Sequence, residues 1–361
     1  MISRKASEVK PFIVMDVMAR AEELERAGES MVHLEVGEPD FDTPAVIKQA
    51  AVEALNRSRT HYTHAMGLLE LREEICSYYQ REYGVVITPD RVMISTGTSP
   101  AMLFMMLALL DPGDEVIISD PHYACYPNFI RTVGGVPVEV KTHAEEGFQY
   151  RPEAIRKLLT PRTKAIVINS PCNPTGIVMA EENLKDVAGF DDRYIISDEI
   201  YHGLVYGLRA RSILEFTDRA FVINGFSKLF AMTGWRLGYI IFPKEFHDAL
   251  RRIHQNFMIS ANSFTQWAGI AALKHAGPDV EKMRAVYDER RVFMIRRLRE
   301  IGFKIRVEPT GAFYVFADGR HLFSDSYKEA FSIVEKAKVG VTPGIDFGGG
   351  GEGFLLSLIH I

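Results

Sequence analysis

A lysine and an arginine stand close together after an apolar run of the sequence. Lys228 follows residues 221–224, and Arg236 lies eight positions further on. A lysine amine can carry an aldehyde cofactor as a Schiff base, and a nearby arginine can bind phosphate through its planar fork of donors. A single lysine after a strand is more often a solvated surface residue. The interpretation therefore depends on which residues accompany it.

An acid and a phenol follow another apolar run, residues 194–197. Asp198 and Tyr201 are three positions apart, so both can reach one ligand. A carboxylate that faces a pyridine nitrogen keeps the ring protonated, and a phenol can donate to a ring oxygen. The alternative for Asp198 is a cap on a following helix.

Two further loops carry polar groups in similar positions. Asn173 precedes a proline after the run 165–168, which favours an extended backbone, although Asn-Pro is also a common turn opener. Gly97, Thr98 and Ser99 stand between the run 92–95 and a helix-like segment, 101–110. Free N–H groups and hydroxyls at a helix start can bind an anion such as phosphate, but Ser and Thr are also ordinary N-caps.

Strand-like runs alternate with helix-like segments between residues 92 and 242, which predicts a mostly parallel sheet covered by helices on both faces. Gly97, Tyr123, Asn173, Asp198 and Lys228 each fall at or just past the end of one run, where open α/β sheets bind ligands. The expected strands are 92–95, 115–119, 136–140, 165–169, 194–197, 221–224 and 237–242.

Together these motifs resemble the fold-type I pyridoxal phosphate enzymes, and among them the class I and II aminotransferases, of the aspartate aminotransferase kind. The resemblance covers nearly the whole chain. Each motif is short and weak alone, but they occur in the family's order and at suitable spacing. The matching segments are 37–41, 62–72, 97–99, 120–123, 173–176, 198–201 and 227–236.

The resemblance implies a role for each candidate residue. Lys228 would form the Schiff base with pyridoxal 5'-phosphate and act as the base, and Asp198 would pair with the pyridinium. Tyr201 and Asn173 would bind the ring 3-oxygen, and Tyr123 would stack on the ring. The phosphate would be bound by Gly97, Thr98, Ser99 and Arg236. Gly37 would leave space beside the substrate. Tyr62 would reach the phosphate from a neighbouring subunit, which predicts a homodimer with shared active sites. For the two tyrosines, simple packing is the alternative.

Two positions depart from the family pattern. Gly225 stands where many members carry a serine, so one phosphate donor is missing, and Ser227 or a backbone N–H is expected to compensate. Leu356 stands where relatives carry the arginine that binds the substrate α-carboxylate. Leucine has neither donor nor charge, so we expect this chain to bind amino acids poorly. The abrupt divergence also suggests that residues 356–361 arise from truncation or a reading-frame change.

Composition agrees with an ordinary globular enzyme. Of 361 residues, 47% are hydrophobic and 25% charged, and the net charge of −5 provides no basic field for nucleic acid. The N-terminus has no apolar signal core and no apolar block is long enough for a membrane span, so a cytoplasmic location is expected. Three cysteines without a C-x-x-C pair, and the pair His61 and His64 without companion ligands, indicate no metal site.

The expected fold is α/β, with a seven-stranded, mostly parallel sheet between helices and a smaller α+β domain. We expect an N-terminal arm at 1–44 that joins the small domain, a large cofactor-binding domain at 45–284, and a small C-terminal domain at 285–361. In the small domain, strands are expected at 304–307, 312–316 and 339–342, with a helix at 326–338. A long charged helix at 279–301 is expected to connect the two domains.

The function implied is transfer of an amino group between an L-amino acid and a 2-oxo acid in two stages. The same residues would also serve a β-elimination lyase acting on C–S bonds. A third alternative, motivated by Leu356, is a catalytically impaired protein that still binds the cofactor. The sequence does not reveal the amino donor.

Overall fold

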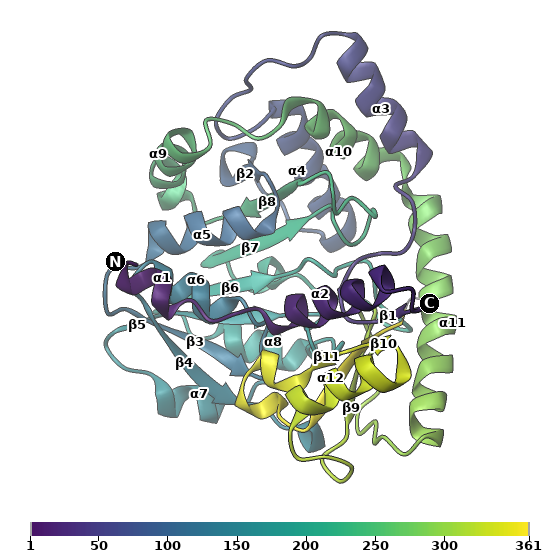
Figure 1. Ribbon diagram of the computed structural model, residues 1–361. Helices are drawn as coiled ribbons and strands as arrows, with labels where there is room; N and C mark the ends of the chain where they lie inside the picture. Colours follow the sequence, from purple (N-terminus) through teal and green to yellow (C-terminus); the bar gives the residue numbers. More distant parts are fainter. Residues whose placement is uncertain (1, 360–361) are drawn as a thin grey trace.

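A seven-stranded sheet forms the centre of the computed structural model, which describes residues 2–359 (Figure 1). The strand order is β2-β8-β7-β6-β5-β3-β4, and β8 alone runs antiparallel to its neighbours. This arrangement confirms the predicted mostly parallel sheet. The strands are β2 (Val92–Ser95), β3 (Glu115–Asp120), β4 (Val136–Lys141), β5 (Thr163–Asn169), β6 (Tyr194–Asp198), β7 (Ala220–Gly225) and β8 (Gly238–Ile241).

Successive side chains of a strand point to opposite faces of the sheet. Because consecutive residues of most strands are apolar, both faces of the sheet are apolar. Ile117 of β3 packs into one core with helices α4, α7, α8 and α10, whereas Val116 and Ile118 pack into a second core with α5, α6 and α9. The helices of this part of the chain are α3 (Ala45–Asn56), α4 (Leu69–Tyr83), α5 (Thr98–Leu109), α6 (Tyr126–Thr132), α7 (Pro152–Leu158), α8 (Glu181–Ala188), α9 (His247–Phe257) and α10 (Ser263–His275).

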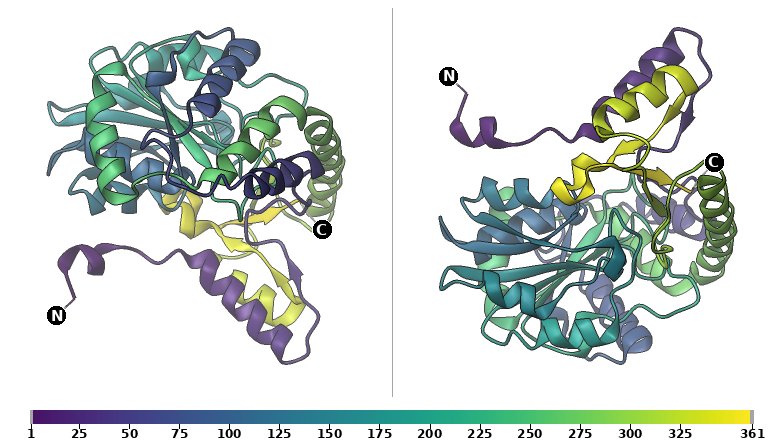
Figure 2. Two further views of the ribbon diagram at one scale, coloured as in Figure 1. Left: turned by 90° about the horizontal axis from the view of Figure 1, so that it is seen from above. Right: turned by 90° about the horizontal axis from the view of Figure 1, so that it is seen from below.

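The two ends of the chain form a second, smaller unit (Figure 2). Strand β1 (Val32–His33) pairs in parallel with β10 (Val339–Gly340), and helix α2 (Ile13–Arg26) packs against α12 (Ser326–Ala337). A three-stranded antiparallel sheet lies beside them, in the order β11-β12-β9. Its strands are β9 (Tyr314–Asp318), β11 (Thr342–Pro343) and β12 (Phe354–Leu358), and a short helix α1 (Arg4–Glu8) precedes α2.

Helix α11 (Gly277–Glu300) lies where the long charged helix was expected, and it contacts both α10 and β9. The proposed domain boundary at residues 284 and 285 falls inside this helix. The boundaries themselves remain a prediction.

One predicted strand is wrong. At residues 304–307 only Lys304 forms a bridge, with Asp318. The chain bends away from β9 at residues 306 and 307, and Pro309, which has no N–H to donate, follows shortly after. Arg306 still contacts Asp318 of β9, with Nε 2.7 Å from Oδ2.

The sequence reasoning also missed strand β12. Phe354–Leu358 is the central strand of the small sheet and pairs with both β9 and β11. Of the tail residues 356–361, the first three therefore belong to this strand, whereas His360 and Ile361 lie outside the described residues. The suggested origin of the tail stays a prediction.

Candidate functional site

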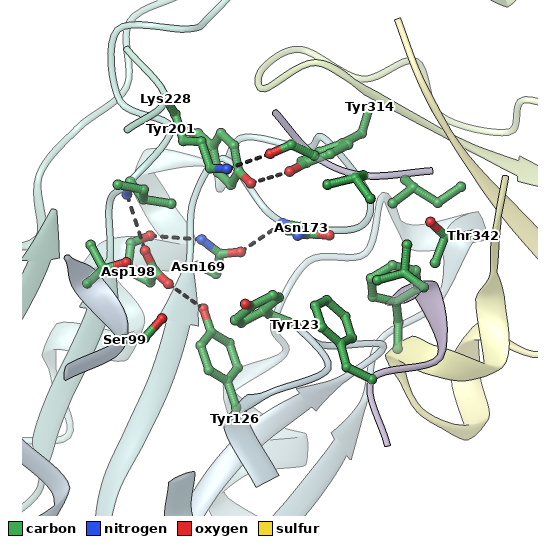
Figure 3. Close-up of a pocket in the computed structure, with 18 of the residues that line it drawn as sticks. Ser99, Tyr123, Tyr126, Asn169, Asn173, Asp198, Tyr201, Lys228, Tyr314 and Thr342 are labelled. Carbon is green, nitrogen blue, oxygen red and sulfur yellow. Dashed lines mark hydrogen bonds between the residues drawn. The ribbon is translucent and has the colours of Figure 1, made fainter. Parts of the chain in front are cut away.

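A cavity of about 240 Å³ lies at the C-terminal edge of the large sheet, facing the small unit (Figure 3). Side chains from both ends of the chain and from the strand ends line it. Of the predicted site residues, it contains Gly37, Thr98, Ser99, Tyr123, Asn173, Asp198, Tyr201 and Lys228. These residues come from separate segments that the parallel topology brings to one edge.

Lys228 follows the end of β7, and its side chain is partly buried. Its Nζ donates to the carbonyl of Gly37 at 2.5 Å, which ties the large sheet to the N-terminal loop. Burial lowers the lysine pKa to about 8, because the charged ammonium loses its hydration. A side chain at Gly37 would place Cβ 2.6 Å from the Tyr314 hydroxyl, so only glycine fits this approach.

Asp198 is the last residue of β6 and is 7% exposed. Its Oδ2 accepts a hydrogen bond from Tyr126 Oη at 2.8 Å, and its Oδ1 accepts one from the Ile200 N–H at 3.2 Å. Burial raises the pKa of this carboxyl to about 6. The chain continues as a turn and not as a helix, so the helix-cap alternative does not apply.

Polar groups of neighbouring strand ends form a connected chain across the cavity. Asn169 donates from Nδ2 to the Asp198 carbonyl at 2.9 Å and accepts from the Asn173 N–H at 2.7 Å. The Asn173 side-chain oxygen is buried and has no partner among the described residues. Tyr201 and Tyr314 share a short hydroxyl contact. An unpartnered buried acceptor beside two phenols indicates space for a polar ligand.

The start of α5 provides donors without acceptors. Gly97 precedes the helix with a φ of 107°, and no side chain caps the helix start. A Cβ at Gly97 would lie 2.6 Å from Arg236 Nη2, so the guanidinium lies directly beside this turn. Uncapped N–H groups, the hydroxyl residues Thr98 and Ser99, and an arginine together suit a phosphate.

The structure does not bring every predicted residue into this cavity. Arg236 lines the adjoining hollow, and Ser227 lines neither. Tyr62 is 81% exposed on a loop held near α10 by the Thr63 N–H bond to Ser260 Oγ at 3.4 Å. Gly225 ends β7 opposite Gly238, where a Cβ would lie 3.1 Å from the Gly238 Cα, so a serine would be crowded there.

Several cavity residues were not predicted from the sequence. Tyr126 bonds to Asp198, Asn169 links two loops, and Tyr314 meets Tyr201. One signal was available for Tyr126, which stands only three positions after the predicted site residue Tyr123. Leu356, predicted as a departure from the family, does line the cavity from β12 and is 3% exposed.

The groups present fit pyridoxal phosphate. A partly buried amine, a buried carboxylate, an amide oxygen without a partner and an uncapped helix start surround one cavity. The amine suits an aldehyde, the carboxylate a pyridinium, and the helix start a phosphate. No group of three or more potential metal ligands occurs within residues 2–359, and no helix in that range has both the length and the apolarity to cross a membrane.

The chain matches one family model and is similar to known aminotransferases. The family model for aminotransferase class I and II matches residues 29–355. The aspartate/prephenate aminotransferase of Thermus thermophilus is 41% identical over 353 residues, which cover 96% of this chain and 91% of the relative. The (5-formylfuran-3-yl)methyl phosphate transaminase of Methanocaldococcus jannaschii is 39% identical over 359 residues, covering 98% and 94%.

Solved structures show the same fold. A double mutant of Thermus thermophilus aspartate aminotransferase superimposes with a TM-score of 0.96 at 40% identity, covering 100% of this chain and 96% of that one. An aminotransferase from Mycobacterium tuberculosis gives a TM-score of 0.95 at 34% identity, covering 99% and 94%. The recognition from sequence is thereby confirmed, and this chain belongs to the class I and II aminotransferase family.

Proposed function

We propose that this aminotransferase moves an amino group between an L-amino acid and a 2-oxo acid with pyridoxal phosphate held by Lys228. The observation that carries the proposal is the partly buried amine of Lys228 and the buried carboxylate of Asp198 in one cavity at the sheet edge. When bound, the cofactor supplies an aldehyde that accepts the amino group and a ring that withdraws electrons from the substrate.

The protein residues would orient the reactants and move one proton. Lys228 would hold the aldehyde covalently, and its freed amine would carry a proton from the substrate α-carbon. Asp198 would sit under the ring nitrogen and keep it protonated, with Tyr126 fixing the carboxylate. Tyr201 and Asn173 would hold the ring oxygen, while Thr98, Ser99, Gly97 and Arg236, assisted by Ser227, would hold the phosphate.

A spectral titration tests the proposal. The cofactor-loaded protein should change its absorption spectrum when amino donors are added, and a 2-oxo acid should then restore it. Release of pyruvate and ammonia from cystathionine without any 2-oxo acid would instead indicate the lyase reaction. A loaded protein whose spectrum no amine changes would contradict the proposal and support the impaired alternative.

The lowered pKa of Lys228 predicts a pH dependence for cofactor attachment. Only the neutral amine attacks an aldehyde, and its fraction increases up to the pKa of about 8. We expect the attachment rate of the apoprotein to rise about tenfold per pH unit below that value and to level off above it. Rapid-mixing absorbance between about pH 6 and pH 10 measures this attachment rate. The reference is Nα-acetyl-lysine, whose ε-amine is fully solvated. A protein rate that keeps rising like the reference would contradict the assignment.

Tyr62 is expected to serve a neighbouring subunit in a homodimer, since it is exposed and lies outside the cavity of its own chain. We expect Tyr62→Phe to weaken cofactor binding by roughly tenfold, because a hydrogen bond to a charged group contributes about 1.5 kcal/mol or more. Equilibrium dialysis measures the effect, and Tyr327→Phe at another exposed tyrosine is the matched control. Equal affinities in both variants, or a monomer in light scattering, would remove this role.

A further inference from the structure

The cavity has a polar half and an apolar half. Asp198, Asn169 and Ser99 lie on one side, at the strand ends and the start of α5, whereas the N-terminal and C-terminal segments close the opposite side, near Thr342 (Figure 3). The apolar side chains that line the cavity from these segments and from α6 are Phe12, Val14, Met15, Phe129 and Phe347. The polar half matches the cofactor, so the apolar half faces the remainder of the substrate.

The N-terminal part of this wall is held in place from two sides. The N–H groups of Ile13 and Val14, at the start of α2, donate to the two carboxylate oxygens of Asp346 at 3.0 and 3.1 Å. Asn128 of α6 bonds both the N–H and the carbonyl of Lys10, at 3.1 Å each. Phe12 lies between these anchors, so its ring has a defined position in the wall.

Phe12 also contacts the ring of Tyr123 edge-on, with centroids 6.1 Å apart and planes at 89°. This geometry is a favourable aromatic arrangement. It extends the apolar surface from the predicted cofactor-stacking residue toward the opening of the cavity. An aromatic group placed there would continue the same packing.

The charges in the cavity also favour an apolar substrate side chain. Among the described residues that line it, Lys228 is the only cation, and its amine is engaged by the aldehyde in the proposed function. The carboxylates are Asp198 and Glu35, and Glu35 is already bonded to His33 Nδ1 at 2.6 Å. The described residues of this chain therefore offer no counter-charge to a second substrate carboxylate, which would lie against apolar side chains, an unfavourable arrangement.

We propose that the amino donor carries a large apolar side chain, aromatic by preference, which packs against Phe12, Met15 and Phe129. Dicarboxylic amino acids are poor donors for this chain. The inference rests on the proposed function, since it concerns the substrate part of the same cavity. It assigns Phe12, Met15 and Phe129 as the residues that determine side-chain specificity.

The test compares L-phenylalanine, L-leucine and L-aspartate by spectral titration of the cofactor-loaded protein. We expect the half-saturating concentration of phenylalanine to be at least about tenfold below that of aspartate. Phe12→Ala should reduce this ratio about tenfold, whereas Phe293→Ala, on the exposed side of α11, should leave it unchanged.

A charge-gain variant gives an independent measurement. Met15 is 44% exposed, so Met15→Lys should fold, and it places an ammonium at the apolar end of the cavity. We expect it to lower the half-saturating aspartate concentration about tenfold, and the uncharged Met15→Gln to leave that concentration near the wild-type value.

Two results would overturn the inference while leaving the proposed function intact: aspartate binding as well as phenylalanine in the wild type, or a Phe12→Ala ratio equal to that of the wild type. Absence of any donor-induced spectral change would overturn both. A phenylalanine preference that Phe12→Ala reduces and Met15→Lys shifts toward aspartate would establish it.

Discussion

Replacing Lys228 by alanine should abolish transamination and covalent attachment of the cofactor together. We expect a loss of turnover of at least about ten thousand-fold, since the same amine serves as attachment point and as the group that moves the proton. The cavity would otherwise stay intact, because Lys228 makes one hydrogen bond, to Gly37, in the described structure. Binding of the cofactor through its phosphate should therefore persist in the variant.

Borohydride reduction followed by peptide mass spectrometry measures the attachment directly. In the wild type the cofactor mass should be found on the peptide that contains position 228, and in the variant on no specific peptide. Lys244→Ala serves as the control, because this lysine begins a short helix remote from the cavity lining. A stoichiometric adduct in the Lys228→Ala protein would refute the assignment of the amine.

The cavity residues that follow the ends of predicted strands could be predicted from the local sequence pattern. Each apolar run became a strand of the large sheet, and all but the edge strand β4 are largely buried. Parallel topology requires the carboxyl ends of such strands to meet at one edge. Asp198 and Lys228 could be placed in one site for this reason alone. The assignment of Leu356 to the substrate side needed the family resemblance in addition.

Contacts between distant segments could not be predicted in this way. Tyr126 and Asp198 are 72 positions apart, and Ile13 and Asp346 are 333 apart. Nothing in the local sequence around Asp346 indicates that its carboxylate will receive the start of α2. Such pairs follow from how the two units pack, so the wall formed by Phe12 and Met15 became visible only in the structure.

The failure at residues 304–307 has a different cause. Alternating side chains there satisfied the strand pattern, with Ile305 buried and Arg306 outward. The pattern does not include the bend at residues 306 and 307 or the following Pro309, so backbone pairing stops after Lys304. Strand β12 was missed because its last residues were interpreted as a tail unrelated to the fold, and not as a buried apolar strand.

Restoring a cation at position 356 should produce the second large effect. Leu356 is a central-strand residue whose side chain lines the cavity beside Thr342 and Val36, where it offers no donor to a carboxylate. An arginine could bind the substrate α-carboxylate with two charge-assisted hydrogen bonds. At about 1.5 kcal/mol each, these bonds amount to about 3 kcal/mol. We therefore expect Leu356→Arg to lower the half-saturating concentration of amino-acid donors roughly 100-fold.

A matched pair of ligands separates this effect from general changes in the cavity. L-Phenylalanine and phenethylamine differ only in the α-carboxylate, so Leu356→Arg should strengthen the response to the amino acid and leave that to the amine unchanged. Leu356→Met preserves apolar volume and should change neither response. Circular dichroism and thermal unfolding verify that each variant folds. Equal gains for both ligands, or no gain in a folded Leu356→Arg protein, would show that the carboxylate binds elsewhere, for example at the N–H groups of the Gly37 loop.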